Sequence, residues 1–398
     1  MKNMGLIYYG SISFPPNRGV KQVVHLLDQL DINTFIVSRS KNTTKALDDY
    51  EGHRVIYLPL QDGKSAFDYS YPFPFNPYWS SCLLSLARKH KWRGMIVRET
   101  PVAWQALNVG QKLSIPVFLD LRENLAAMYQ KYRQRNPLES FFKKPFFVNG
   151  YEKRIMHRFD HIFTSTKELA EWVGQKYMTN RKKISVLENT PHESYIEDCT
   201  RALSQIDTEQ RRQTRIVYAG QLSKEKGIFD ILLAMPLVLD RLPSVVLRII
   251  GDGPAQADLE KKVAEMGLER NVEFLPMLSM HDLAFALAEC SLGVESSRPD
   301  PHTNQTVPGK LFEYMAAGLP LLSSPRVPIK RILAEYDCGR IYDSFSTEDI
   351  AGKMLGMLDD KEELERMGKN ARNAVISRFN WRHNLEVVRE VLKGNQIV

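Results

Sequence analysis

The chain has 398 residues and a mass of 45.8 kDa, which at about 150 residues per domain predicts two or three domains. Its 43% hydrophobic and 25% charged residues are ordinary for a globular protein and argue against disorder, collagen and a coiled coil. The net charge of +7 permits an anionic partner such as nucleic acid, a lipid headgroup or a nucleotide phosphate. No signature of a nucleic-acid module is present, so nucleic acid is the least favoured of the three. The cysteines and histidines lack metal-ligand spacing, and no run of about 18 apolar residues or signal peptide is visible. We therefore expect a cytoplasmic protein without a bound metal.

Short apolar runs alternate with helical patterns in the first half of the chain. Strands are predicted at Leu6–Tyr9, Thr34–Val37, Arg54–Leu58, Met95–Arg98, Val117–Asp120 and His161–Thr164. The clearest helical pattern, from Val20 to Leu30, repeats apolar residues on one face. The polar stretch 195–213 shows no apolar period and is predicted to separate two domains.

The alternation restarts in the second half. Strands are predicted at Arg215–Ala219, Val245–Ile250, Val272–Leu275, Leu292–Glu295 and Leu319–Leu322, and helices at Ile228–Leu239, Leu259–Met266 and Asp282–Ala288. Strands that alternate with helices predict parallel sheets in an α/β architecture. Two such series predict two Rossmann-like domains that face each other across a cleft.

Ligands of such sheets bind at the carboxyl ends of strands, beside helix N-termini, so the loops after strands are the candidate sites. The first loop, Gly10 to Gly19, is either an anion site with close backbone approach or a plain strand-to-helix turn. In the second, Lys224 and Lys226 precede a helix, where lysine is unfavourable without an anion. The alternative there is a solvated lysine pair. The third loop, Gly251–Pro254, is a ligand contact or a tight turn.

The fourth loop runs from Pro301 to Leu322 and contains a short helix with Glu313 among apolar residues. A carboxylate there suits hydrogen bonds from sugar hydroxyls, whereas the alternative is a solvent-facing glutamate with good helix propensity. Backbone amides of the preceding loop are candidate contacts for phosphate or sugar oxygens. The candidates in that loop are Asn304, Gln305, Thr306 and Val307.

The second half resembles the nucleotide-sugar domain of the retaining glycosyltransferases of family 4, which have the GT-B fold. The motif Gly-x-Leu-x-x-x-Lys-Gly appears at 220–227, Gly-Asp-Gly-Pro at Gly251–Pro254, and KLFEYMAAGLP at Lys310–Pro320. Phe379-Asn380-Trp381 resembles the start of the helix that returns to the first domain. This predicts an acceptor-side domain at 1–200, closed by a helix at 380–398, and a nucleotide-sugar domain at 210–379.

The resemblance implies roles for several residues. Lys226 corresponds to the lysine that binds the donor diphosphate, beside Gly220, and Gln221 stands where the family commonly has an arginine. Glu313 corresponds to the second of two glutamates eight positions apart and would hold the ribose. Gln305 occupies the first position, where an amide cannot act as an anionic nucleophile. Gln305, Lys226 and Glu313 are therefore the candidate catalytic residues, and Gly220, Gln221 and Gly251 candidate donor contacts.

The resemblance implies transfer of a sugar from a nucleoside-diphosphate sugar to a glycan or lipid-linked acceptor, with retention of the sugar's anomeric configuration. We expect a uridine nucleotide, no metal requirement, and a role in surface polysaccharide or glycolipid synthesis. The leaving phosphate would help to deprotonate the acceptor. On the acceptor side Asp120, Arg122 and Glu123 are candidate contacts, and the alternative is an ion-paired loop. A nucleotide-sugar epimerase of similar fold and a non-catalytic nucleotide-sugar-binding subunit remain the other functions.

A basic segment at 131–158 interleaves lysines and arginines with phenylalanines. That composition suits an anionic membrane surface or a lipid-linked acceptor, and would place the protein at the inner face of the cell membrane. The alternative is a core helix with buried aromatic side chains and solvated lysines.

Overall fold

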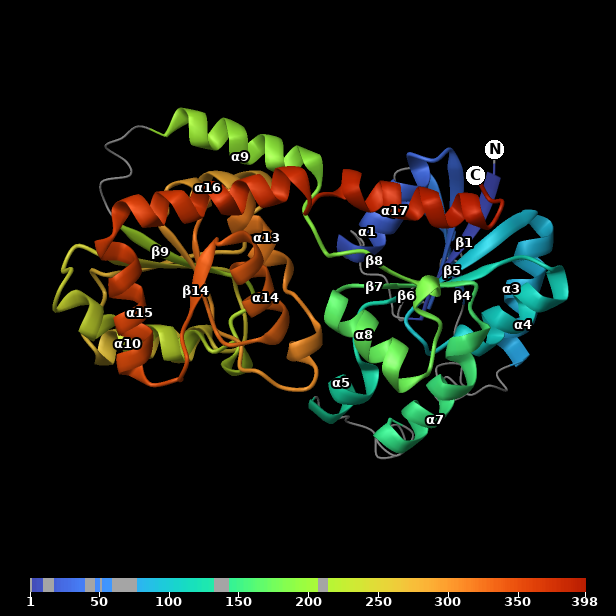
Figure 1. Cartoon of the computed structure of the whole chain (residues 1–398), viewed down its shortest axis with the longest axis horizontal. Coiled ribbons are helices and arrows are strands. Elements are labelled where there is room, and N and C mark those ends of the chain that lie inside the picture. Colours follow the sequence, from blue (N-terminus) through green and yellow to red (C-terminus); the bar gives the residue numbers. More distant parts are fainter. Residues whose placement is uncertain are drawn as a thin grey trace. The chain divides into compact units, whose positions relative to one another are not determined.

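The computed structural model describes residues 2–9, 18–39, 47–50, 52–58, 77–131, 143–206 and 214–398. The chain divides into two compact units (Figure 1). Unit 1 comprises Met1–Asn189 and Arg382–Val398, and unit 2 comprises Thr190–Trp381. The first crossing of the chain between them therefore lies at Asn189, before the predicted limit at residue 200.

Unit 1 is built on an eight-stranded sheet in the order β3-β4-β2-β1-β5-β6-β7-β8. The strands are β1 (Lys2–Tyr8), β2 (Ile32–Arg39), β3 (Leu47–Tyr50), β4 (His53–Leu58), β5 (Trp92–Arg98), β6 (Val117–Leu121), β7 (His161–Thr164) and β8 (Ile184–Val186). Its helices are α1 (Arg18–Asp28), α3 (Pro77–Lys89), α4 (Ala103–Leu113), α5 (Leu125–Lys131), α7 (Pro145–Ile155), α8 (Lys167–Lys176) and α17 (Trp381–Gly394). All strands pair in parallel except β3, which pairs antiparallel with β4.

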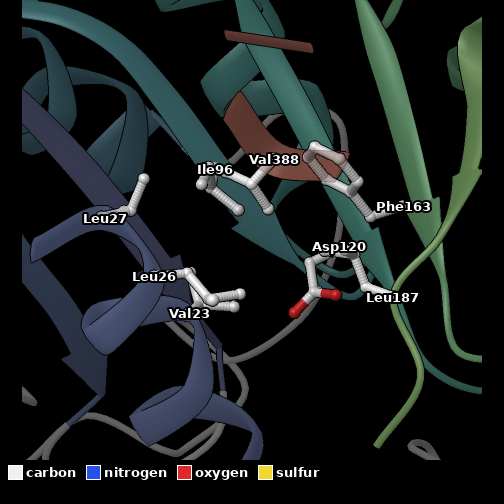
Figure 2. Close-up of a pocket in the computed structure, with 8 residues that line it drawn as sticks. All are labelled: Val23, Leu26, Leu27, Ile96, Asp120, Phe163, Leu187 and Val388. Carbon is white, nitrogen blue, oxygen red and sulfur yellow. The ribbon is translucent and has the colours of Figure 1, made fainter. Parts of the chain in front are cut away.

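Both faces of this sheet are covered, as the apolar strands require. Met95 and Val97 of β5 belong to the core cluster that includes α3 and α4. The intervening Ile96 lies on the other face, beside residues of α1 and α17 (Figure 2). Because successive side chains of a strand alternate between faces, one apolar run fills both layers.

Unit 2 contains a six-stranded parallel sheet in the order β11-β10-β9-β12-β13-β14. The strands are β9 (Arg215–Ala219), β10 (Val246–Ile250), β11 (Val272–Leu275), β12 (Leu292–Glu295), β13 (Leu321–Ser323) and β14 (Gly339–Ile341). The helices are α9 (Glu193–Gln205), α10 (Ile228–Leu239), α11 (Gln256–Glu265), α12 (Met280–Ala288), α13 (Gly309–Ala316), α14 (Val327–Tyr336), α15 (Thr347–Asp359) and α16 (Lys361–Ser377). The strand order is that of a Rossmann sheet, with its switch point between β9 and β12.

One sequence-based expectation fails in this unit. The stretch 195–213, predicted to lack an apolar period, overlaps helix α9, which buries Tyr195, Cys199 and Ala202. These residues are spaced i, i+4 and i+7, so they form one narrow stripe among polar neighbours. Tyr195 and Cys199 join the core cluster that includes α13 and α16, so α9 is part of the second unit.

Candidate functional site

The loops that follow β9 and β10 in unit 2 are held together by their backbones. Gly220 N donates to Ile250 O at 2.8 Å, and Leu222 N donates to Asp252 O at 2.7 Å. Gly251 has a φ of +136°, and a Cβ added there would lie 2.1 Å from Gly220 O. Only glycine therefore fits position 251, and the contact fixes the loop at the carboxyl end of β9.

Lys226 is placed by the turn between β9 and α10. It ends the short helix η3 (Lys224–Lys226) and precedes Gly227, which has a φ of +69°. A Cβ at Gly227 would lie 2.1 Å from Ser296 O, and the Ser296 hydroxyl donates to Lys226 O at 2.7 Å. The turn that carries Lys226 is thus fastened to the end of β12, on the other side of the switch point.

The two lysines of this turn have different surroundings. The side chain of Lys224 is 73% exposed, and its Nζ lies 3.0 Å from Asp258 Oδ2 on α11. Lys226 is half-buried, and its charge acts on Lys310. The solvated-pair alternative therefore describes Lys224, whereas Lys226 lies among the charged groups at the switch point.

Lys310, in the first turn of α13, is a cation to which the interpretation of the sequence motifs assigned no role. Its Nζ lies 3.8 Å from the centre of the Tyr218 ring, and a Cβ at Gly220 would lie 3.9 Å from its Cδ. Burial lowers the pKa of Lys310 to about 8. Glu295 raises this pKa, Lys226 and Arg326 lower it, and Glu313 raises it. The spacing Lys310-x-x-Glu313 could have shown that both side chains share one helix face.

Glu313 lies in α13, where it is 8% exposed, so the alternative of a solvent-facing glutamate is wrong. The helix is held close to β9 because the Tyr314 hydroxyl accepts a bond of 2.6 Å from Ala219 N. Tyr195 of α9 donates to Glu313 O at 3.5 Å. The carboxylate is therefore carried by a helix whose residues from Leu311 to Ala316 are all buried.

Arg326 fixes the loop before α13, and no sequence motif pointed to this residue. Its guanidinium donates to Thr303 O at 2.8 and 3.1 Å and to Thr306 O at 2.6 Å. It also pairs with the buried Glu295 at 3.3 Å. Burial raises the pKa of Glu295, but the charges of Arg326 and Lys310 and the Ser297 hydrogen bonds outweigh it and lower this pKa overall.

The loop held by Arg326 carries the remaining donor-side candidates. Gln305 ends the short helix η4 (Thr303–Gln305), and Asn304 Oδ1 accepts from Val327 N at 3.2 Å, which ties the loop to α14. Val307 is buried. Gln221 is exposed in the loop after β9. The structure thus gathers Gly220, Lys226, Gly251 and Glu313 around the switch point, while Asn304, Gln305, Thr306 and Val307 lie in the loop that Arg326 secures.

In unit 1, Asp120 is an ion-paired residue. Its carboxylate lies 2.6 Å from Arg98 Nη1 and 2.6 Å from Arg122 Nε, and the side chain is 1% exposed. Arg122 also donates to Leu187 O at 2.7 Å. Gly19 lies against the same cluster, since a Cβ there would lie 2.1 Å from Arg98 Nη2. Gly10 lies outside the described residues.

The pocket beside Asp120 is otherwise apolar, with α1, β5, β7 and α17 contributing to its walls (Figure 2). The carboxylate therefore positions the two arginines, as the ion-paired alternative predicts for this loop. Glu123 is half-buried, and its charge adds to desolvation in raising the pKa of the half-buried Glu99. Glu99 stands at the end of β5 with a φ of +64°, and its Oε1 accepts from Arg122 N at 3.0 Å. Sequence patterns gave no indication of Glu99.

Comparison with known proteins finds its matches mainly in the second unit. Residues 201–374 match the family glycosyl transferases group 1. The chain is 28% identical over 170 residues to the sulfoquinovosyl transferase SQD2 of Arabidopsis thaliana, covering 42% of this chain and 31% of that protein. It is 28% identical over 156 residues to the alpha-D-kanosaminyltransferase of Streptomyces kanamyceticus, covering 39% of each. The matched part therefore spans between 31% and 39% of the length of these curated relatives.

Solved structures extend the likeness to the whole fold. The sucrose-phosphate synthase of Thermosynechococcus elongatus aligns with a TM-score of 0.73 at 15% identity, over 99% of both chains. Alr3699/HepE of Anabaena, solved in complex with UDP, aligns with a TM-score of 0.73 at 14% identity, over 99% of this chain and 100% of that one. The protein has the GT-B fold of two Rossmann-like domains. Within this fold, the match to the family glycosyl transferases group 1 covers residues 201–374.

Proposed function

We propose that the protein is a retaining glycosyltransferase that uses a nucleoside-diphosphate sugar, with a uridine nucleotide as the donor's leaving group. The observation that carries this proposal is the position of Lys226 at the switch point of unit 2, beside Lys310 and fastened to β12 through Ser296. This is where an open α/β sheet binds nucleotides. The UDP bound in the Anabaena neighbour is consistent with the nucleotide.

The proposed reaction needs stabilisation of a leaving diphosphate. The acceptor oxygen forms a bond to the anomeric carbon while the bond from that carbon to the β-phosphate oxygen breaks on the same face. The acceptor proton passes to the leaving phosphate oxygen. Lys226 and backbone amides stabilise the charge that develops there, and Glu313 holds the ribose. Gln305 bonds a sugar hydroxyl, and as a neutral amide it offers no nucleophile, which agrees with same-face attack.

Thermal stabilisation by UDP, GDP and ADP, without and then with magnesium, tests the donor site. Selective stabilisation by UDP in the absence of metal is the expected result, because a ligand that binds only the folded state raises the unfolding temperature. Folded protein that none of the three nucleotides stabilises would contradict the proposal. Product analysis without an acceptor then separates transfer from epimerisation, in which the sugar changes and its diphosphate bond persists.

We further propose that unit 1 contacts an anionic membrane carrying a lipid-linked acceptor. Helix α7 exposes Phe146 by 81% and Phe147 by 37%, although its opposite side is buried. Lys153 and Arg154 are exposed on the same helix. Of the described helices, none combines the length and hydropathy needed to cross a bilayer. The core-helix alternative does not account for these two exposed phenylalanines.

Flotation with vesicles tests this surface. We expect binding to vesicles that contain phosphatidylglycerol, weaker binding at high salt, and no binding to purely zwitterionic vesicles. Phe146→Ser should weaken flotation, whereas Ile376→Ser, at another exposed apolar residue (53%), should not. Absence of salt-sensitive binding to the anionic vesicles would end the membrane proposal and leave the donor site unaffected.

A further inference from the structure

The donor site contains a second cation whose position differs from the expected one. Position 221, directly after Gly220, carries a neutral and exposed glutamine. The side chain of Lys310 instead approaches the neighbouring Gly220 from α13, since its Cδ would lie 3.9 Å from a Cβ at Gly220. A lysine from one helix and a lysine from the β9–α10 turn therefore approach the switch point from its two sides.

Two features show that Lys310 is held in place there. Its ammonium lies over the face of Tyr218, 3.8 Å from the ring centre, which is a favourable cation–π distance. The Tyr218 hydroxyl is fixed in turn, because it donates to Gln221 O at 3.0 Å. The ring thus links Lys310 to the loop that carries Gly220.

The charged groups around Lys310 are compatible with a bound anion. Glu295 of β12 and Glu313 of α13 are the acidic groups that act on it, and Lys226 of η3 and Arg326 are the basic ones. Glu295 is already paired with Arg326. Lys310 also stands in the first turn of a helix, where a cation is unfavourable and an anion is favoured.

We propose that Lys310 binds the diphosphate of the donor together with Lys226, supplying the second fixed positive charge of the site. The inference rests on the proposed nucleotide-sugar function and assigns a binding residue that the sequence motifs did not. In this arrangement the negative charge that develops on the leaving phosphate is stabilised by Lys226 of η3 and Lys310 of α13, rather than by two residues of one loop.

The pKa of Lys310 gives the proposal a specific signature. Because burial lowers this pKa to about 8, part of the Lys310 population is uncharged at pH 8. A bound diphosphate favours the ammonium form, so binding at pH 8 should take up about half a proton per site. The phosphates themselves are fully ionised at this pH, since their last pKa is about 6. Affinity should therefore fall as the pH rises above 8.

Calorimetry with UDP at pH 8, in two buffers of different ionisation enthalpy, measures affinity and proton uptake together. Lys310→Met should weaken UDP binding about tenfold or more and abolish the uptake. Lys310→Arg should keep most of the affinity but lose the uptake, because arginine does not titrate near pH 8. Lys224→Met, at the neighbouring surface lysine, should change neither quantity.

The outcomes separate the inference from the function on which it rests. If the folded wild-type protein binds none of UDP, GDP and ADP, the proposed function falls and the inference with it. If the wild type binds UDP and folded Lys310→Met binds it equally well, the inference alone is overturned. If Lys310→Met does not fold, Lys310→Arg decides, because unchanged proton uptake in that variant overturns the assignment.

Discussion

The two lysines of the turn before α10 differ by their partners, and this difference yields a matched pair of variants. Lys226→Ala should weaken nucleoside-diphosphate binding about 10- to 150-fold, because a charge-assisted bond to phosphate is worth roughly 1.5–3 kcal/mol. Lys224→Ala removes only a surface pair with Asp258, which is 55% exposed, so its affinity should stay within about twofold of wild type. Equal effects of both substitutions in titration calorimetry would mean that general surface charge, and not Lys226, attracts the nucleotide.

The buried carboxylate of Glu313 can be tested without disturbing the packing of α13. Glu313→Gln keeps the shape of the side chain and removes its charge, so the protein's melting temperature should change little. If the carboxylate holds the ribose, nucleotide affinity and turnover should both fall by about tenfold or more. A large drop in melting temperature with intact nucleotide affinity would instead assign Glu313 to the structure of unit 2.

The turn that carries Lys226 depends on glycine for two separate reasons, and another turn isolates them. Gly227 and Gly267 have φ values of +69° and +65°, but a Cβ at Gly227 would lie 2.1 Å from Ser296 O, whereas nothing lies within 4 Å of one at Gly267. Gly267→Ala should therefore cost only the backbone strain, about 1–2 kcal/mol. Gly227→Ala must also displace the turn from β12, so it should lower the free energy of unfolding by more than Gly267→Ala does and should weaken nucleotide binding. Equal losses of stability and unchanged affinity in denaturant and binding titrations would show that this contact does not position Lys226.

The loop before α13 is held by the ion pair of Arg326 and Glu295. Arg326→Met leaves a buried carboxylate and two loop carbonyls without their donor. The free energy of unfolding at pH 7 should therefore fall by about 3–5 kcal/mol. Arg298→Met breaks a pair with Asp230 in which the arginine is 60% exposed, so the free energy of unfolding should fall by only about 1 kcal/mol or less.

This ion pair also predicts the sign of a pH effect. The pKa of Glu295 is lowered on folding, so the stability that the pair contributes is present above the carboxyl's unfolded pKa of about 4.3 and is lost as the pH falls through the lowered folded value. The difference in unfolding free energy between wild type and Arg326→Met should therefore narrow on acidification from pH 7 to pH 3. A difference that stays constant over this range in urea titrations would exclude the pair as its source.

Elements with strong periodicity could be predicted from the sequence, and contacts between distant segments could not. Strands such as Arg215–Ala219 and Leu292–Glu295 are found at the predicted residues because apolar runs between turns specify buried parallel strands. Helix α9 was missed because its three buried residues form a narrow stripe in a polar segment. Arg326 was missed because its role depends on carbonyls about 20 residues away along the chain. Motifs identify which loops matter, whereas the folded structure shows which charges meet.

At the scale of the whole molecule, the last helix of the chain belongs to unit 1, while the proposed nucleotide site lies in unit 2. The side chains of Val388 and Leu392 are buried in unit 1, and Asn384 Nδ2 donates to Glu188 O at 2.9 Å. Leu392→Ala should therefore destabilise unit 1 by about 2–5 kcal/mol, because it leaves a cavity in a packed core.

The affinity for a nucleoside diphosphate should not follow this loss of stability. The residues that we assign to the donor site all lie within Thr190–Trp381, so Leu392→Ala should lower the first unfolding temperature in calorimetry yet leave the dissociation constant at 25 °C within about twofold. Lys393→Ala, at the exposed neighbouring position, should change neither quantity. A marked loss of affinity in folded Leu392→Ala would show that the donor site requires an intact unit 1, and that the two units form one binding unit in solution.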